Sequence, residues 1–275
     1  MKKNVREYNV DNEYILFDYL ISHVNDSKNN IKSFLKNGNV YVNDKSITKY
    51  NYVVSSGDKV VIKAYHTDID ILYEDSDLVI VNKDSGLLTI SDGKSENTLY
   101  KMVSSYVKLN NKNNKIFIVN RLDKDTSGIV VFAKNERIKD ILQDKWNDIV
   151  LTRKYVAVVE GTTDLSGTIR SYLNENKEHI VYSGSSGKLA ITKYERVRYN
   201  NKYSMLNVYL YTGRKNQIRV HMKDIGHSVV GDKKYGSKNN PIGRLMLHCE
   251  LLEFKYNNKV LKIECKYPTI FDNVV

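Results

Sequence analysis

The sequence predicts an α+β fold, in which a small module with two helices precedes a larger domain rich in strands. Between residues 12 and 62, apolar residues recur at helical spacing. From Ile71 onward the chain is rich in Val, Ile, Tyr and Thr, and it gives many short strands with few helical patterns. Because helices and strands do not alternate regularly, we do not expect a doubly wound fold. A chain of 275 residues has room for one large domain and a small satellite.

The amino-terminal module is predicted to span residues 12–63 and to contain two helices followed by short strands. Ser27 can cap the second helix, because its hydroxyl can accept a hydrogen bond from a backbone N–H of the first turn. A Gly-Asn pair at residues 38–39 then ends this helix. The strands are expected at residues 40–42 and 60–62, and the apolar stripes at Leu16, Tyr19, Leu20 and His23 or Val24 in the first helix and Ile31, Phe34 and Leu35 in the second.

The larger domain is predicted at residues 71–270, after a short linker at residues 63–70. Helices are expected where apolar residues return at helical spacing, and strands where β-branched and aromatic residues cluster. The sequence shows no internal repeat and no low-complexity tail. The helices are predicted at residues 97–108, 136–144 and 217–225, and the strands at residues 78–81, 116–119, 129–133, 155–160, 206–211 and 260–265.

Composition favours a polyanionic partner. The chain carries 43 Lys and Arg against 32 Asp and Glu, a formal charge of +11. An excess of this size suits nucleic acid, because neutralising phosphates releases condensed counterions. Abundant Lys and Asn are also typical of compositional bias in a source genome, so charge alone does not identify the partner.

The cellular setting is predicted from what the chain lacks. Cys249 and Cys265 are too few for a disulfide scaffold and lack metal-ligand spacing with His, so we expect reduced thiols. The basic start runs into polar residues rather than the apolar core of a signal peptide. No apolar stretch approaches the roughly 18 residues that a membrane helix needs. We therefore expect a cytoplasmic protein with no membrane partner.

The run from Asn120 to Gly128 is the most informative segment of the chain. It places the carboxylate of Asp123 between Arg121 and Lys124, on a turn that the following Thr-Ser-Gly sequence closes, and an apolar strand comes next. A carboxylate at the edge of a strand, with no second acid at fixed spacing, indicates a lone nucleophile or base rather than an acid pair. The alternative is an Asp-rich surface turn before a core strand.

Three further blocks have polar residues set among apolar ones. Tyr155 in the first can offer its face to a planar base and its hydroxyl to a proton, although it is also one of 21 tyrosines and suits strand packing. The histidines are sparse and not aligned with carboxylates, so no metal site is predicted. The blocks are Leu151 to Gly161, Thr212 to Met222 with its continuation Gly226 to Gly236, and Gly243 to Cys249.

Taken in order, the blocks resemble the RluA/RluD family of RNA pseudouridine synthases. Asp123 stands in a match to that family's Arg-Leu-Asp-x-x-Thr-Ser-Gly motif, whose strand ends in Ala133-Lys134. Tyr155 matches the Tyr of Lys-x-Tyr-x-Ala-x-Val-x-Gly, and Arg219 matches the Arg of His-Gln-Ile-Arg-Val-His. The resemblance covers about residues 12–270. It implies a mixed, mainly antiparallel sheet in the catalytic domain.

The resemblance also implies a role for each matched residue. Asp123 would attack the anomeric carbon or abstract a sugar proton, and sequence does not decide between these. Tyr155 would stack on the base and assist proton removal from carbon five, while Arg219 would pair with Asp123 and keep it ionised. Arg121 is a candidate to fill the space that the flipped uridine leaves. Leu247 is a candidate apolar wall of the uracil pocket, with ordinary core packing as the alternative.

The amino-terminal module resembles the small RNA-binding domain named after ribosomal protein S-four. In that domain the second helix and the following turn lie against RNA backbone. Lys28, Lys32 and Lys36, which repeat every four residues on one helix face, would then contact phosphates; the alternative is a solvated helix face. The matching positions are Gly38, Val40, Val42, Asn43, Gly57, Asp58 and Val60.

The prediction is an isomerase that converts specific uridines in RNA to pseudouridine, without cofactor or metal, and acts as a monomer. Large-subunit ribosomal RNA is the first expected target and transfer RNA the next. Three positions depart from the family pattern: Asn120 and Asn216 replace histidines, and Asp84 replaces a proline. The two missing imidazoles keep a catalytically idle RNA-binding or ribosome-assembly factor as the alternative. A nucleoside hydrolase is a further alternative.

Overall fold

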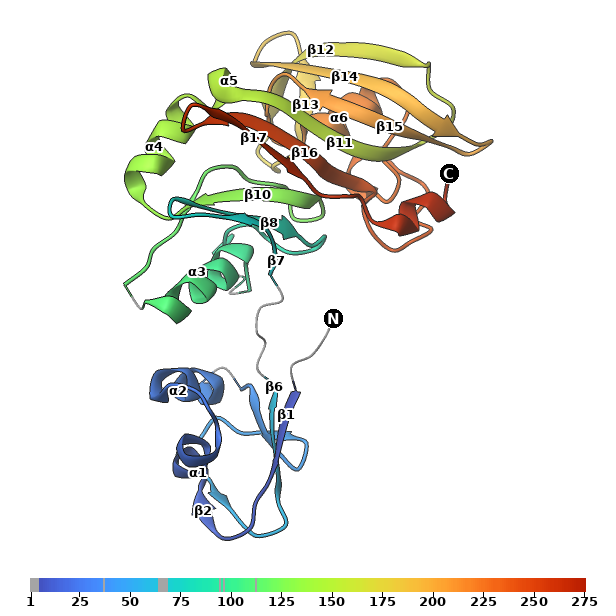
Figure 1. The fold of residues 1–275 in the computed structure, drawn as a ribbon. Coiled ribbons are helices and arrows are strands. Elements are labelled where there is room, and N and C mark those ends of the chain that lie inside the picture. Colours follow the sequence, from blue (N-terminus) through green and yellow to red (C-terminus); the bar gives the residue numbers. More distant parts are fainter. Residues whose placement is uncertain (1–4, 37, 64–68, 94, 96, 112) are drawn as a thin grey trace. The chain divides into compact units, whose positions relative to one another are not determined.

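The computed structural model describes residues 5–36, 38–63, 69–93, 95, 97–111 and 113–275. The chain divides into two compact units, Met1–Asp68 and Ile69–Val275 (Figure 1). The linker predicted at residues 63–70 falls mostly on residues 64–68, which lie outside the described residues. No helix in the described part of the chain is long and apolar enough to cross a membrane.

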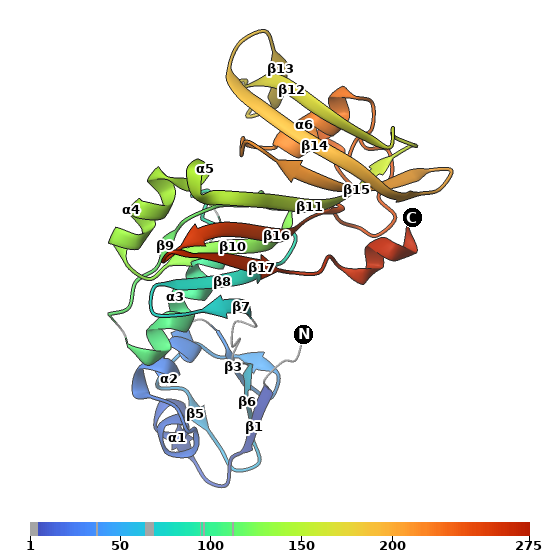
Figure 2. The same ribbon diagram turned by 45° about the horizontal axis from the view of Figure 1, so that its top comes forward.

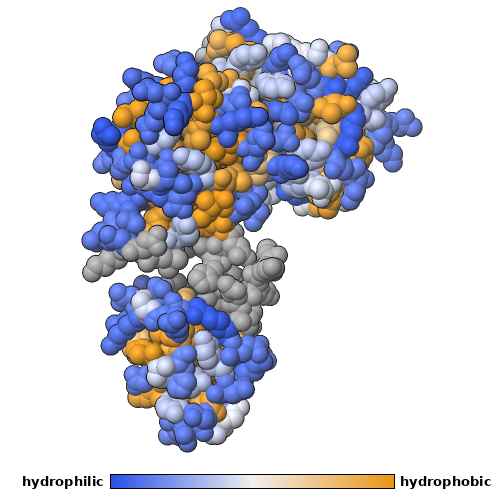
Figure 3. All heavy atoms as spheres, viewed as in Figure 1, coloured by the Kyte–Doolittle hydropathy of each residue, from blue (hydrophilic) through white to orange (hydrophobic). Residues whose placement is uncertain are grey.

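The amino-terminal unit packs two helices against short strands. Leu20 and Leu35, on the predicted apolar stripes, are fully buried, and Val24 rather than His23 completes the first stripe. The face of this unit in view in Figure 3 is mostly hydrophilic. Its four-stranded sheet has the order β1 (Val5–Asn9), β6 (Lys59–Lys63), β3 (Val40–Val42), β4 (Lys45–Ser46); β2 (Tyr14–Ile15) pairs with β5 (Val53–Val54), and the helices are α1 (Leu16–His23) and α2 (Lys28–Lys36).

Local sequence explains how the amino-terminal helices and turns begin and end. The Ser27 hydroxyl accepts a hydrogen bond from the backbone N–H of Asn30 at 3.2 Å, which satisfies a free donor at the start of α2. Gly38, with a φ of +69°, follows the end of α2. Asn43 and Asp44 both have positive φ, 47° and 64°, which suits the tight turn between β3 and β4.

The larger unit is built on an 11-stranded sheet. Among the strand pairs described, only β10 and β16 run parallel, so the predicted mixed, mainly antiparallel sheet is confirmed. The strand order is β13 (Val181–Gly184), β12 (Ser166–Glu175), β14 (Lys188–Tyr199), β15 (Tyr203–Leu210), β11 (Val150–Glu160), β16 (Leu247–Tyr256), β10 (Ser127–Ala133), β8 (Leu78–Lys83), β7 (Asp70–Glu74), with β17 (Lys259–Glu264) on β16 and β9 (Phe117–Ile118) on β10.

The helices of the larger unit cover two different parts of this sheet. Figures 1 and 2 show α3 and α4 near β8 and β10, and α6 near β13 and β14. One apolar core therefore lies around β8 and β10, and another between α6 and the middle of the sheet. The helices are α3 (Leu99–Asn110), α4 (Glu136–Asp144), α5 (Trp146–Ile149) and α6 (Gln217–Asp224), with short 3-10 turns at Lys233–Tyr235 and Thr269–Asn273.

The predicted helices and strands are present, and several strands were missed. Helix 136–144 has the predicted bounds, and helices 97–108 and 217–225 shift by at most two residues. The sequence did not predict the long strands at residues 166–175 and 188–199. In residues 166–175 exposed residues alternate mostly with half-buried ones, and in residues 189–194 half-buried residues, which include Lys193, alternate with buried ones. Neither segment is a clear alternation of apolar and polar residues, so pairing with neighbouring strands identifies them.

Candidate active site

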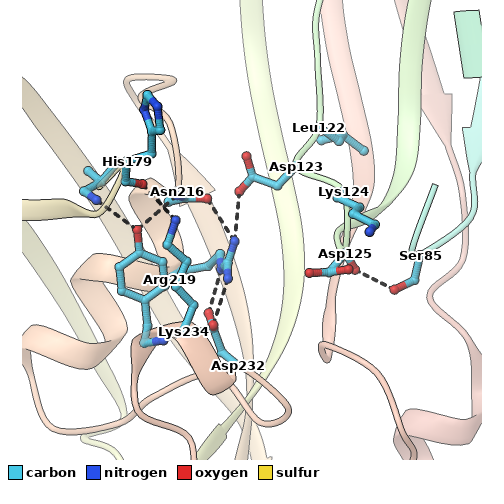
Figure 4. Close-up of polar contacts among 12 residues, drawn as sticks. Ser85, Leu122, Asp123, Lys124, Asp125, His179, Asn216, Arg219, Asp232 and Lys234 are labelled. Carbon is cyan, nitrogen blue, oxygen red and sulfur yellow. Dashed lines mark hydrogen bonds and ion pairs between the residues drawn. The ribbon is translucent and has the colours of Figure 1, made fainter. Parts of the chain in front are cut away.

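Asp123 lies on the turn that leads from β9 into β10. The backbone N–H of Thr126 donates to the Asp123 carbonyl at 3.2 Å, which closes the turn. The Ser85 hydroxyl donates to the carbonyl of Asp125 at 2.6 Å and ties this turn to a neighbouring one (Figure 4). The Asp123 side chain keeps 31% exposure, so a substrate can reach its carboxylate.

Lys83, at the end of β8, anchors the Asp123 turn. Its side chain is fully buried, and burial lowers its pKa to about 8, so the ammonium is still charged at neutral pH. It donates to three backbone carbonyls, those of Asp84 at 2.9 Å, Leu87 at 2.7 Å and Lys124 at 2.9 Å. One buried cation therefore joins the turn after β8 to the turn that carries Asp123. The sequence alone does not reveal this role, because a lysine at the end of an apolar strand is its only signal.

The first two residues of β10, Ser127 and Gly128, pair with β16 just after the Asp123 turn. Gly128 has a φ of +115°, and a Cβ there would lie 2.3 Å from the carbonyl oxygen of Cys249, so only glycine fits. Ser127 Oγ lies 2.8 Å from His248 Nδ1, and His248 Nε2 lies 2.9 Å from the carbonyl oxygen of Cys265. Nε2 must then carry the proton, because a carbonyl only accepts.

The Ser127–His248 pair does not form a nucleophilic site. Ser127 is 3% exposed, and the partner of His248 is a backbone carbonyl rather than a carboxylate. Arg244 Nη2 also donates to Ser127 Oγ at 2.6 Å. Burial lowers the pKa of His248 to about 4, which keeps the ring neutral. These contacts clamp β10 to β16 next to the Asp123 turn.

Arg219 approaches Asp123 from helix α6, on the other side of the site. Its Nη1 lies 3.7 Å from Asp123 Oδ2, an ion pair rather than a hydrogen bond (Figure 4). Its Nε and Nη2 donate to the two oxygens of Asp232 at 2.6 and 2.8 Å, and Nη1 donates to Asn216 Oδ1 at 2.9 Å. The guanidinium also lies 4.9 Å from the ring centroid of Tyr235. Arg219 is therefore held rigidly with one nitrogen facing Asp123.

The charge of Arg219 is shared between two carboxylates. Asp232 is fully buried and takes the bidentate contact, whereas Asp123 takes the longer one. Burial raises the pKa of Asp123 above its usual value, and the positive charges of Arg219, Lys215 and Lys83 oppose that rise. Arg219 therefore favours the ionised form of Asp123, while Asp232 takes the shorter, bidentate contact. The sequence alone does not indicate a role for Asp232.

Tyr155 lies on β11. It pairs with Cys249 on the neighbouring strand β16, and it packs against the apolar cluster that contains Leu247. Burial raises the pKa of Tyr155 well above its usual value, with further contributions from Cys249 and from the negative charge of Asp123. Its hydroxyl is therefore protonated at neutral pH and can donate a hydrogen bond, while the expected assistance of Tyr155 in removing the proton from carbon five stays a prediction.

The other predicted residues lie in varied surroundings. Leu247 is 3% exposed inside the apolar cluster between α6 and the sheet, so most of its surface is core. Arg121 is exposed, and no hydrogen bond or ion pair joins it to the residues that the structure describes. Lys28, Lys32 and Lys36 are exposed on α2 in the amino-terminal unit. The structure thus brings Asp123 and Arg219 together, and Tyr155 pairs with Cys249 of β16, as does Gly128 just beyond the Asp123 turn.

The two asparagines that depart from the family pattern both make structural hydrogen bonds. Asn120 Oδ1 accepts from the backbone N–H of Val131 at 2.7 Å. Asn216 adopts a left-handed backbone, with a φ of 55°, just before α6. Its side chain bridges Arg219 and the Tyr235 hydroxyl, which it reaches at 3.0 Å. Both amides therefore support the site. The described residues contain no cluster of metal-ligating side chains.

Comparison with known proteins gives a consistent result. A family model described as RNA pseudouridylate synthase matches residues 77–224. The "Uncharacterized RNA pseudouridine synthase YhcT" of Bacillus subtilis (strain 168) is 30% identical, over 94% of this chain and 91% of the relative. "Ribosomal large subunit pseudouridine synthase D" of Borreliella burgdorferi (strain ATCC 35210 / DSM 4680 / CIP 102532 / B31) is 31% identical, over 84% and 74%. The solved structure of human RNA Pseudouridylate Synthase Domain Containing 4 has the same fold, with a TM-score of 0.62 at 21% identity over 74% of this chain and 90% of that one.

Proposed function

The chain belongs to the family of RNA pseudouridylate synthases, which are isomerases, and we propose that it converts specific uridines in RNA to pseudouridine with Asp123 as the reacting carboxylate. The observation that carries the proposal is the position of Asp123, partly exposed and 3.7 Å from a buried arginine. A fixed cation beside a reactive carboxylate suits a reaction in which that carboxylate must be charged.

In this reaction the bond between uracil N1 and ribose C1′ breaks, the base turns, and a bond forms between its C5 and C1′. Asp123 would either bond to C1′ or take a sugar proton, and in both cases it is released at the end. The proton on C5 is lost to solvent and N1 takes up a proton, so the product is an isomer of uridine and no oxidant or reductant is needed. Tyr155 would place its ring against the base and donate its hydroxyl hydrogen bond.

The surroundings of Asp123 favour isomerisation over hydrolysis of the nucleoside bond. Ordinary glycosidases need two carboxyl groups, one to protonate the leaving group and one to activate water or attack. The second carboxylate close to this site is Asp232, and it is fully buried and bound through both oxygens to Arg219. It is therefore not available as an acid or base, which leaves Asp123 to act alone.

The substrate we propose is RNA, with large-subunit ribosomal RNA first and transfer RNA second. The first choice is supported by the relative whose name specifies the ribosomal large subunit. The target uridine must leave its stack to reach Asp123, at a cost of a few kcal/mol, and the exposed Arg121 would fill the vacated space. Leu247 would supply apolar surface behind the base.

The division of labour we propose follows the two units. Residues 12–63 would act as an S-four-type RNA-binding domain, with Lys28, Lys32 and Lys36 on phosphates, and residues 71–270 would form the catalytic domain. The enzyme would act as a cytoplasmic monomer without cofactor. Exposure of the three lysines on one helix supports the first assignment.

Tritium release from RNA labelled at uracil C5 tests the activity. We expect release without free uracil; free uracil would indicate a hydrolase, and RNA binding without release would indicate an idle binding factor. Pseudouridine mapping of cellular RNA with and without the gene then identifies the target.

A further inference from the structure

Arg153 is a half-buried arginine on β11, two residues before Tyr155. Its Nη2 donates to Asn147 Oδ1 at 3.1 Å, and its Nε is buried without a hydrogen-bond partner in the described structure. A buried donor without a partner is uncommon, because it loses its hydrogen bond to water and gains nothing in return. Gly213 lies close to the guanidinium, since a Cβ there would be 2.8 Å from Arg153 Nη1.

Among the residues that the structure describes, no acid forms an ion pair with Arg153. The groups that act on it most among the described residues are Tyr155, Cys249 and Arg214, and burial together with Arg214 lowers its pKa. Arg214 is exposed, and its Nε donates to the carbonyl of Leu189 at 3.0 Å rather than to a carboxylate. Two arginines thus lie near each other with no bound acid, next to Tyr155.

Two other arginines of the same unit each form an ion pair with an aspartate. Arg198 also has a buried Nε without a hydrogen-bond partner, but its Nη2 is paired with Asp272. Arg219 has Asp232. The missing partner of Arg153 is therefore a feature of that place in the fold and not of arginines in this sheet generally.

We propose that Arg153 and Arg214 form a binding site for one RNA backbone phosphate beside the target uridine. A phosphate would supply the acceptor that the Arg153 guanidinium lacks and separate the like charges, and arginine donors suit its oxygens. Arg153 is half-buried rather than fully buried, and position 213 has no side chain that would cover its Nη1. The RNA assignment rests on the proposed function, because the site adjoins Tyr155, where the base would stack.

Equilibrium binding of a fluorescent oligouridylate, measured across KCl concentrations, tests the site. In the double variant Arg153→Met/Arg214→Met we expect about tenfold weaker binding and a log–log salt slope smaller by about 0.7, the value for one phosphate on a single strand. Arg153→Met and Arg214→Met should each lose part of that slope, since the remaining arginine still acts on the same phosphate. Arg153→Lys should keep most of the slope, because a charge remains.

Two matched variants separate charge from structure. Asn147→Ala removes the structural hydrogen bond of Arg153 but no charge, and Arg198→Met removes an arginine that already has an acid partner; both should keep the wild-type slope. An oligouridylate with neutral methylphosphonate linkages should bind wild type and Arg153→Met equally. Thermal unfolding of each variant checks that the fold is intact.

Wild-type affinity and slope in both arginine variants would overturn the site. If calorimetry with inorganic phosphate detects binding that needs Arg153 while oligouridylate binding is unaffected, the site takes a free anion and the RNA assignment falls. Tritium release by the wild-type enzyme, measured in parallel, keeps the two proposals apart. Absence of release contradicts the proposed function and leaves the binding result standing, whereas release with unchanged binding in the variants contradicts only the phosphate site.

Discussion

The two units of this chain use their cations in opposite ways. In the amino-terminal unit, Lys28, Lys32 and Lys36 project from α2 into solvent. In the larger unit, Lys83 and Arg219 are buried and each of their contacts is directed at a particular oxygen. Exposed cations act on a polyanion at a distance and are screened by salt, whereas buried cations determine geometry and the charge of their neighbours. Changes in the first group should therefore alter affinity, and changes in the second should alter turnover or folding.

The largest effect on turnover is expected at Asp123, the carboxylate near the buried cations. Asp123→Asn keeps the shape of the side chain but removes its charge, so tritium release should fall to background while RNA still binds. Asp125→Asn is the matched control, because the side chain of Asp125 is exposed and the Ser85 hydroxyl donates to its backbone carbonyl, which the substitution keeps. An Asp123→Asn enzyme that keeps a tenth of wild-type activity would show that the mechanism is wrong.

Arg219→Met should lower turnover by orders of magnitude, and Arg219→Lys should recover part of it, because a point charge remains without the planar fork. The sequence alone suggests that the fold tolerates this change. The structure corrects that expectation, since Asp232 would be left buried and unpaired, at a cost of about 3–5 kcal/mol.

Adding Asp232→Asn to Arg219→Met separates the two effects. The double variant should regain thermal stability, since no buried charge is left without a partner, but it should not regain tritium release. Recovery of both would assign Arg219 a purely structural role, and full activity in Arg219→Met would point to another cation, with Arg214 the first suspect.

Asp232→Asn by itself should change the pH dependence of turnover. Asp123 must be ionised to react, so wild-type activity should fall as the pH drops below its raised pKa. With Asp232 neutral, the charge of Arg219 acts on Asp123 alone and lowers that pKa, so the acid limb of the kcat profile should move to lower pH. We expect turnover at neutral pH to fall about tenfold because the bidentate orientation is weakened. An acid limb that does not move would contradict the shared-charge arrangement.

His248 should make folding sensitive to acid without taking part in the reaction. Its pKa is about 4 in the fold, against 6.5 for an ordinary histidine. Between these values the unfolded chain binds a proton that the native protein does not, so stability falls as the pH drops through this window. The loss should reach about 3 kcal/mol at pH 4, at 1.36 kcal/mol per pH unit. In His248→Gln, the free energy of unfolding measured with denaturant should depend less on pH than in the wild type. An equal pH dependence in both proteins would contradict the lowered pKa of His248.

The smallest effect on turnover is expected in the amino-terminal unit. Ala at Lys28, Lys32 and Lys36 should reduce the salt slope of RNA binding by about 0.7–0.9 for each phosphate that is no longer neutralised, with little change in turnover at saturating RNA. Lys59→Ala is the control, because Lys59 is already paired with Glu7 at 2.7 Å. An unchanged slope in the triple variant would show that α2 does not contact RNA. Loss of turnover with retained binding would instead assign this unit to positioning the uridine.

The sequence by itself determined what depends on neighbouring residues. Ser27 starts α2, and an amphipathic pattern over residues 136–144 is α4 with the same bounds. The motif around Asp123 and the segment that contains Arg219 were identified from their residues, and the structure places the two side chains 3.7 Å apart. Their roles in the reaction stay predictions. Such local signals survive because capping, helical periodicity and turn formation act over a few residues.

Only the tertiary structure decided which partners the charges have. The pairing of Lys83 with the Lys124 carbonyl joins residues 41 apart, and the contact of Ser127 with His248 spans 121 residues. Even Arg219 and Asp232, 13 residues apart, meet only because a turn brings the chain back after α6. The strands at residues 166–199 likewise acquire their identity from pairing. No local pattern encodes these contacts, because their energy comes from burial, which exists only once distant segments have come together.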